Sequence, residues 1–117
     1  MQIEEIGFAK RKKSEALVLP FVEGKKGAVL VSDLKAKEFL TLPALKNKDF
    51  SGKQEEVSLV YSEGLEKRIL LLGLGKEEKL TDETIRLAYA ALVKECRSLK
   101  LKTVNLLFPK KLKHKTL

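Results

Sequence analysis

Four large aliphatic residues in a row, at positions 69–72, are the strongest feature of the hydrophobic pattern. Arg68 precedes them, and Gly73-Leu74-Gly75-Lys76 follows. An unbroken apolar run between a charged start and a glycine stop is typical of a strand that is buried on both faces. We therefore predict a central strand at residues 68–72.

The clearest helix signal begins at Thr81, whose hydroxyl can accept a hydrogen bond from a first-turn amide. Apolar residues then recur at helical spacing: Ile85, Ala88, Tyr89, Leu92, Val93, Cys96 and Leu99. A second strand-like run follows at residues 103–108. A strand, a helix and a strand in this order form one crossover unit with parallel strands. The pattern thus predicts an α/β sheet.

Alternation of apolar and polar residues at 57–61 predicts a further strand, joined to residues 68–72 by a turn at Gly64 as an antiparallel hairpin. Another strand is expected at 16–21, with Pro20 at its end, where a missing backbone donor is tolerated. Residues 28–31 can pair back on it through the connection at 24–27.

Three segments carry weaker signals. Residues 2–8 are compatible with a short edge strand. A helix is expected within residues 34–40, capped by Ser32 or Asp33, and Pro43 either ends or restarts it. Turn-forming residues fill positions 46–53, where Phe50 is the expected anchor into the core.

A family resemblance rests on the same stretches. Residues 68–76, then 80–83 and 85–88, preceded by 50–55, resemble the amino-terminal domain of the leucyl aminopeptidases, also called cytosol aminopeptidases. Residues 16–24 echo it more weakly. The resemblance implies a macrodomain-like mixed sheet with helices packed on it, attached to a separate carboxy-terminal catalytic domain. It also implies that two divalent metal ions, manganese or zinc, belong to that second domain, and that the parent forms a hexamer.

Length and composition fit one folded domain. The 117 residues are 44% hydrophobic and 34% charged, which is typical of a globular protein. We assign residues 1–109 to the α/β domain, whole or truncated, and residues 110–117 to a basic tail. The family domain continues with elements that pack on the sheet, so we expect uncovered apolar surface and self-association.

The longest apolar run is too short to cross a bilayer, and residues 1–5 lack the order of a signal peptide. The sequence therefore predicts a cytoplasmic protein with no membrane partner. Cys96 is the single cysteine and lies on the apolar stripe of the helix, so we expect a buried thiol rather than a nucleophile.

Gly73-Leu74-Gly75-Lys76 lies between a strand and a helix, where bare amides and a lysine can hold a phosphate. However, Glu77 and Glu78 follow it and would repel an anion. A plain turn is therefore the favoured interpretation. An ADP-ribose or nucleotide site of the macrodomain kind stays open as an alternative.

No residue set predicts a metal or catalytic site. His114, the only histidine, lies in the basic tail, and the acidic pairs 4–5, 55–56, 77–78 and 82–83 each suit a surface role. A serine nucleophile would need a histidine base nearby. We therefore assign no catalytic, cofactor-binding or metal-ligating residue to this chain.

The net charge of +8 is concentrated at 10–13 and in the four lysines of the tail. Some bacterial members of the resembling family are also DNA-binding regulators, and the resemblance implies that the amino-terminal domain has a part in that role. Aromatic residues make up only 6% of the chain, so nucleic-acid binding would be weak and phosphate-driven. The favoured function is a non-catalytic domain with an assembly or regulatory role in a two-metal aminopeptidase. A basic nucleic-acid-binding module is the alternative from another class.

Overall fold

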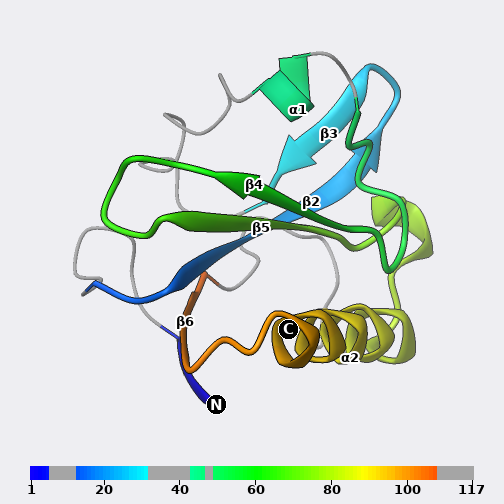
Figure 1. The fold of residues 1–117 in the computed structure, drawn as a ribbon. Helices are drawn as coiled ribbons and strands as arrows, with labels where there is room; N and C mark the ends of the chain where they lie inside the picture. Colours follow the sequence, from blue (N-terminus) through cyan, green and yellow to red (C-terminus); the bar gives the residue numbers. More distant parts are fainter. Residues whose placement is uncertain (6–12, 32–42, 47–48, 108–117) are drawn as a thin grey trace.

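The computed structural model describes residues 1–5, 13–31, 43–46 and 49–107 of the chain. They form a six-stranded mixed sheet with a long helix against one face (Figure 1). The strands are β1 (Gln2–Glu5), β2 (Ala16–Gly24), β3 (Gly27–Leu30), β4 (Val57–Tyr61), β5 (Arg68–Gly73) and β6 (Thr103–Leu106). The helices are α1 (Pro43–Lys46), the short 3-10 turn η3 (Glu77–Lys79) and α2 (Asp82–Ser98). The predicted α/β class, a mixed sheet with a helix packed on it, is confirmed.

The strand order is β1-β6-β2-β5-β4, and β3 pairs with the end of β2. β2 lies parallel to both β5 and β6, and β1 lies parallel to β6. β4 and β5 form the predicted antiparallel hairpin, as do β2 and β3. The predicted crossover unit is also present, with β2 lying between its two strands.

Pro20 corrects one expectation. We expected it at the end of its strand, but β2 continues through it to Gly24. Pairing with β6 ends at Val18, and pairing with β3 begins at Phe21, so Pro20 lies in the gap between these two neighbours. The carbonyl of Pro20 faces this side, because it accepts from Val31 N at 3.1 Å. The missing N–H would face the same gap, so the ladder to β5 loses no hydrogen bond.

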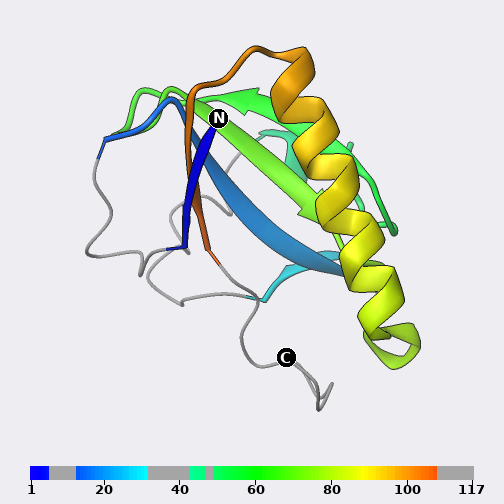
Figure 2. The ribbon, with the colours of Figure 1, turned by 90° about the horizontal axis from the view of Figure 1, so that it is seen from below.

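α2 begins where the sequence predicts. The hydroxyl of Thr81 accepts from Thr84 N at 3.1 Å, and Thr84 Oγ1 accepts from Thr81 N at 2.9 Å, which makes a reciprocal cap. The helix lies against one face of the sheet along β5 (Figure 2). Its buried residues are Ile85, Ala88, Leu92 and Cys96, so the predicted apolar stripe faces the sheet.

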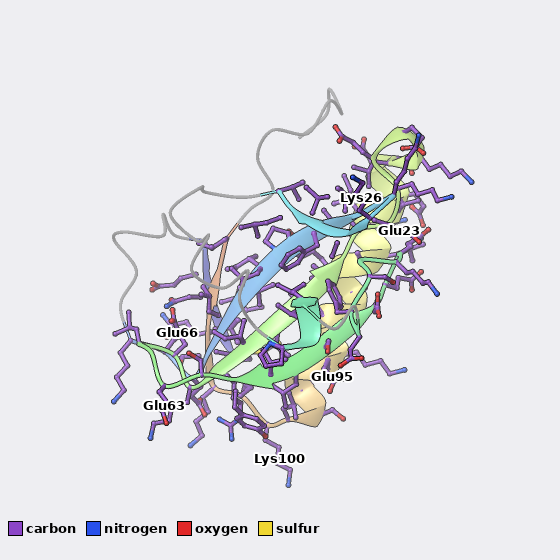
Figure 3. All side chains as sticks on the ribbon, turned by 90° about the horizontal axis from the view of Figure 1, so that it is seen from above. Glu23, Lys26, Glu63, Glu66, Glu95 and Lys100 are labelled. Carbon is purple, nitrogen blue, oxygen red and sulfur yellow. The ribbon has the colours of Figure 1, made fainter. Side chains whose placement is uncertain are left out.

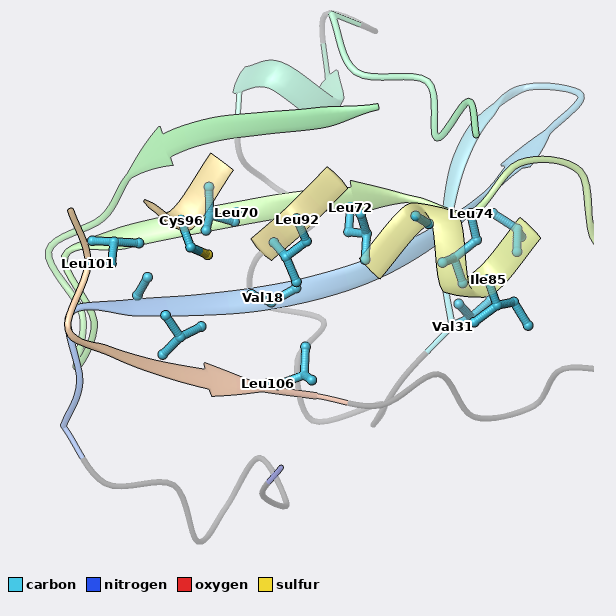
Figure 4. Packing of buried hydrophobic residues seen from close by; sticks show 14 of the residues in the cluster. Val18, Val31, Leu70, Leu72, Leu74, Ile85, Leu92, Cys96, Leu101 and Leu106 are labelled. Carbon is cyan, nitrogen blue, oxygen red and sulfur yellow. The ribbon is translucent and has the colours of Figure 1, made fainter. Parts of the chain in front are cut away.

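Alternating residues of the central strands fill two cores. On the α2 side, Leu70 and Leu72 pack with Leu92 and other residues of the helix (Figure 4). On the other side, Ile69 and Leu71 pack in a second cluster that contains Phe50. The run at 69–72 is therefore buried on both faces, as predicted.

Phe50 anchors its loop as expected. Its side chain is buried, and its ring meets that of Phe21 edge to face, with centroids 5.3 Å apart. α1 begins at Pro43, which agrees with a helix that restarts there. The helix expected within 34–40, residues 6–8 of the expected edge strand, and residues 108–117 lie outside the described residues.

Candidate functional site

The glycine turn after β5 is the first candidate, because its backbone amides could face an anion. In the structure these amides already donate to carbonyls of the same chain. Gly73 N donates to Glu56 O at 2.7 Å, Leu74 N to Phe21 O at 2.8 Å and Gly75 N to Gly52 O at 2.9 Å. A phosphate would have to break these bonds, so the plain-turn interpretation fits this conformation better than a nucleotide site.

Residues 51–56 lie directly over this turn, and we call them the crossing segment. A Cβ atom added to Gly73 would lie 2.0 Å from Lys53 O, closer than any real contact. Gly52 has a φ of +85°, and a Cβ there would lie 2.8 Å from Val22 O. The glycines are therefore required by the close approach of two backbone segments.

A single carboxylate oxygen holds the crossing segment in shape. Glu56 Oε1 accepts from the backbone N–H groups of Ser51 at 3.3 Å, Gly52 at 3.0 Å and Lys53 at 3.1 Å. It also accepts from Ser51 Oγ at 3.3 Å. We expected the acidic pair at 55–56 to have a surface role, whereas Glu56 organises this loop. The signal available was a Ser-Gly turn followed by a glutamate within capping distance.

A cleft of about 530 Å³ opens beside the turn, at the carboxyl ends of β2 and β5. This end of parallel strands is where ligands bind in open α/β sheets. It is lined by residues 22–25, Val29 and residues 76–78. Glutamates and lysines both line it, so its charge favours no single class of ligand. Glu23 lies at the same end of the sheet as Lys26 (Figure 3).

A buried polar pair lies toward the opposite end of the sheet, where Figure 3 places Glu66. Asn105 Nδ2 donates to Glu66 Oε2 at 2.9 Å, and the two side chains are 4% and 1% exposed. The bond joins the turn before β5 to β6. This pair was not predicted from the sequence, although an asparagine between Val104 and Leu106 was a signal that a buried partner exists.

Among the described residues, no group of three or more His, Cys, Asp or Glu side chains is placed to hold a metal ion. These donors therefore do not fit a two-metal centre. Cys96 is buried as expected, and burial together with the nearby charge of Glu95 raises the pKa of its thiol. His114 lies outside the described residues.

Basic side chains gather around a second hollow, of about 400 Å³, at the amino ends of β2 and β5. Lys13, Lys67 and Arg68 line it together with Glu15 and Leu65. The basic positions 10–12 and 110–115 lie outside the described residues. Within the described part of the chain, no helix is long and apolar enough to cross a membrane.

Comparison with known proteins gives one consistent result. The family described as "Cytosol aminopeptidase family, N-terminal domain" matches residues 18–116. A protein of Protochlamydia amoebophila named "Probable cytosol aminopeptidase" is 44% identical over 105 residues, and one of Chlamydia abortus with the same name is 39% identical over 103 residues. Each match covers 86% of this chain and 20% of the relative. The chain therefore belongs to the cytosol aminopeptidase family and corresponds to its N-terminal domain.

Proposed function

We propose that this domain is a non-catalytic part of a leucyl-aminopeptidase-like enzyme, and that it serves assembly or regulation. The enzyme's carboxy-terminal catalytic domain would release amino-terminal residues from peptides and would hold two divalent ions, manganese or zinc. The observation that carries this proposal is the family match, because that family is described as an N-terminal domain. In agreement, the chain spans 20% of the length of the relatives.

The donor set of the described residues supports the same assignment. Two-metal hydrolysis needs several ligands that converge on ions about 4 Å apart. Glu56, the carboxylate with the most hydrogen bonds given above, is engaged by its own loop, and Cys96 is buried in the core under α2. The proposed partners are the catalytic domain and further copies of the enzyme, in a hexamer. The domain would act in the cytoplasm, because the relatives are named cytosol aminopeptidases.

The test uses the purified chain and the remainder of the Protochlamydia amoebophila relative, the part that the chain does not match. Each is incubated with a leucine anilide and manganese, zinc or cobalt. The chain alone should give no turnover above a buffer blank and should retain no stoichiometric metal after dialysis. It should bind the remainder in a pull-down and change the turnover or the assembly of the remainder. Turnover by the chain alone would contradict the proposal, as would a failure to bind the remainder.

Nucleic-acid binding is a second candidate, and the basic hollow at Lys13, Lys67 and Arg68 favours it. Binding through phosphates alone is independent of sequence and falls steeply with salt, because bound counterions are released. A DNA shift assay over a salt series should show weak binding that disappears as salt rises. Lys67→Glu should weaken binding to all sequences alike. Lys79→Glu is the control, because Lys79 lies in η3, beyond the opposite end of β5 from this hollow. A sequence-specific complex that survives high salt would contradict this mode.

A further inference from the structure

β4 (Val57–Tyr61) forms one border of the sheet. It ends the strand order, and among the described strands only β5 pairs with it. Figure 3 shows it as the outermost strand on its side of the ribbon. The edge of a sheet exposes backbone groups that can pair with another chain.

The pairing with β5 decides which backbone groups face outward. Gly73 N donates to Glu56 O at 2.7 Å on one side of β4, and Ser62 N donates to Lys67 O at 2.8 Å on the other. Residues of an antiparallel strand alternate between bonded and non-bonded positions. The N–H and C=O groups of Val57, Leu59 and Tyr61 therefore point away from β5, toward the outer edge.

This edge lacks the usual protection against pairing. β4 carries no lysine, no proline and no other charged residue, and its register with β5 contains no bulge. These are the devices by which proteins block exposed edges. Tyr61 is 70% exposed, which is unusual for a large aromatic side chain beside a core. Val57 and Leu59, on the same face of β4, are partly buried against the core under α2.

We propose that β4 is an interface between two copies of this chain, paired antiparallel about a twofold axis at Leu59. In this register Tyr61 of one copy lies opposite Val57 of the second copy, and each Leu59 lies opposite the other. The outward backbone N–H and C=O groups of the three residues then form hydrogen bonds with those of the second copy across the axis. The exposed ring of Tyr61 gains an aliphatic neighbour, which is a favourable cross-strand pair.

A second copy fits this edge because the strand is complementary to itself. The twofold axis matches each outward donor with an acceptor, and on the face that carries Val57, Leu59 and Tyr61 it places each apolar side chain opposite another apolar side chain. Each copy carries a net charge of +8, and β4 offers an approach that is free of charged side chains. This inference rests on the assembly role proposed above and names the surface that would perform it.

Hydrogen exchange on the unmodified chain tests the surface directly. At low concentration the amides of Val57, Leu59 and Tyr61 should exchange quickly, whereas those of Ser58 and Val60 are protected by β5. At high concentration the first three should become protected, in step with dimer formation measured by sedimentation. A chain that stays monomeric at its highest soluble concentration would overturn the proposal. So would a dimer in which these three amides stay unprotected.

Two substitutions at Tyr61 test the same edge without touching the core. Tyr61→Pro removes an outward N–H that makes no bond to β5, and Tyr61→Lys adds a like charge to the edge. Each should raise the dimer dissociation constant by about tenfold to a hundredfold, because two symmetry-related contacts are lost. Leu87→Lys, at a 38% exposed position of α2, is the matched control and should leave dimerisation unchanged. Circular dichroism checks folding, and equal dimerisation of folded Tyr61 variants would refute the interface.

Salt and the catalytic remainder separate the outcomes. Added salt should tighten the dimer, because it screens the repulsion between two chains that each carry a net charge of +8. It also screens the repulsion at each end of the paired strands, where Glu55 of one copy lies opposite Glu63 of the second copy. If the three amides become protected only when the remainder of the relative is added, then the edge binds that remainder, and the interface between two copies is overturned. A monomer that still binds the remainder would refute this inference and leave the proposed function standing.

Discussion

Asn105 and Glu66 are joined by a hydrogen bond of 2.9 Å between two buried side chains that are 39 residues apart in the sequence. Removing one side chain of a buried pair takes a hydrogen bond away from the other, which costs about 1–3 kcal/mol. Asn105→Ala and Glu66→Ala should each lower the free energy of unfolding in urea by about this amount. The double variant should lose less than the sum of the two, because the shared bond is lost only once. Strictly additive losses would show that the two side chains do not support each other.

The contact between Gly73 and the crossing segment predicts a severe effect from one methyl group. Gly73→Ala would bring a Cβ within 2.0 Å of Lys53 O, so the crossing segment must move away from the turn. We expect a loss of about 3 kcal/mol or more in the free energy of unfolding. Gly64→Ala is the matched control, because its Cβ would meet Ser62 Oγ at an ordinary 3.4 Å and should change stability by less than about 1 kcal/mol. Equal stability of the two variants would contradict the close approach.

Glu56 should be the most sensitive acidic residue of its loop. Glu56→Ala leaves three backbone N–H groups without their acceptor, and we expect a loss of about 2–3 kcal/mol on urea unfolding. Glu56→Gln keeps one side-chain oxygen and should lose less. The exposed Glu78 provides the control, and Glu78→Ala should lie within about 0.5 kcal/mol of the unmodified chain. Faster hydrogen exchange at Ser51, Gly52 and Lys53 in Glu56→Ala would locate the effect, and unchanged exchange there would argue against it.

Cys96 predicts how stability responds to alkaline pH. Burial and the charge of Glu95 raise the pKa of its thiol in the folded state above the ordinary value of 9.0. The folded chain therefore holds this proton more tightly than the unfolded chain does. Its contribution to stability is complete below the unfolded pKa and is lost as the pH rises from there through the folded pKa.

The comparison with Cys96→Ala isolates this term. The difference in unfolding free energy between the two proteins should be constant below about pH 8 and should shrink above about pH 9. In the same range, an alkylating reagent should label the native thiol far more slowly than the unfolded one. A constant difference across the whole range, together with fast labelling of the native protein, would contradict the buried thiol.

The features that were predictable from sequence depend on neighbours along the chain. The reciprocal cap at Thr81, the stripe on α2 and the two hairpins depend on spacings of a few residues, and the structure contains all of them. The family resemblance also rested on short stretches, and the comparisons confirm it.

The features that were missed depend on pairing partners. Pro20 could be placed within its strand only by knowing that the pairing of β2 with β6 ends at Val18 and that its pairing with β3 begins at Phe21. The role of Gly73 required the crossing segment above it, and the role of Asn105 required Glu66 from a distant turn. Glu56 was a local signal, but its loop closes only with the positive φ of Gly52.

The central position of β2 also has a consequence for how the sheet forms during synthesis. Ala16 pairs with Arg68 on one side and with Val104 on the other, so both lateral neighbours of this early strand are translated much later. Among the described strands, only β3 can pair with β2 soon after β2 emerges from the ribosome. The chain must close two long loops before its central strand is enclosed, which slows folding. In the meantime, the apolar side chains and unpaired backbone groups of β2 are exposed to other chains. Nascent chains that stop before residue 103 should therefore be the ones that chaperones hold longest.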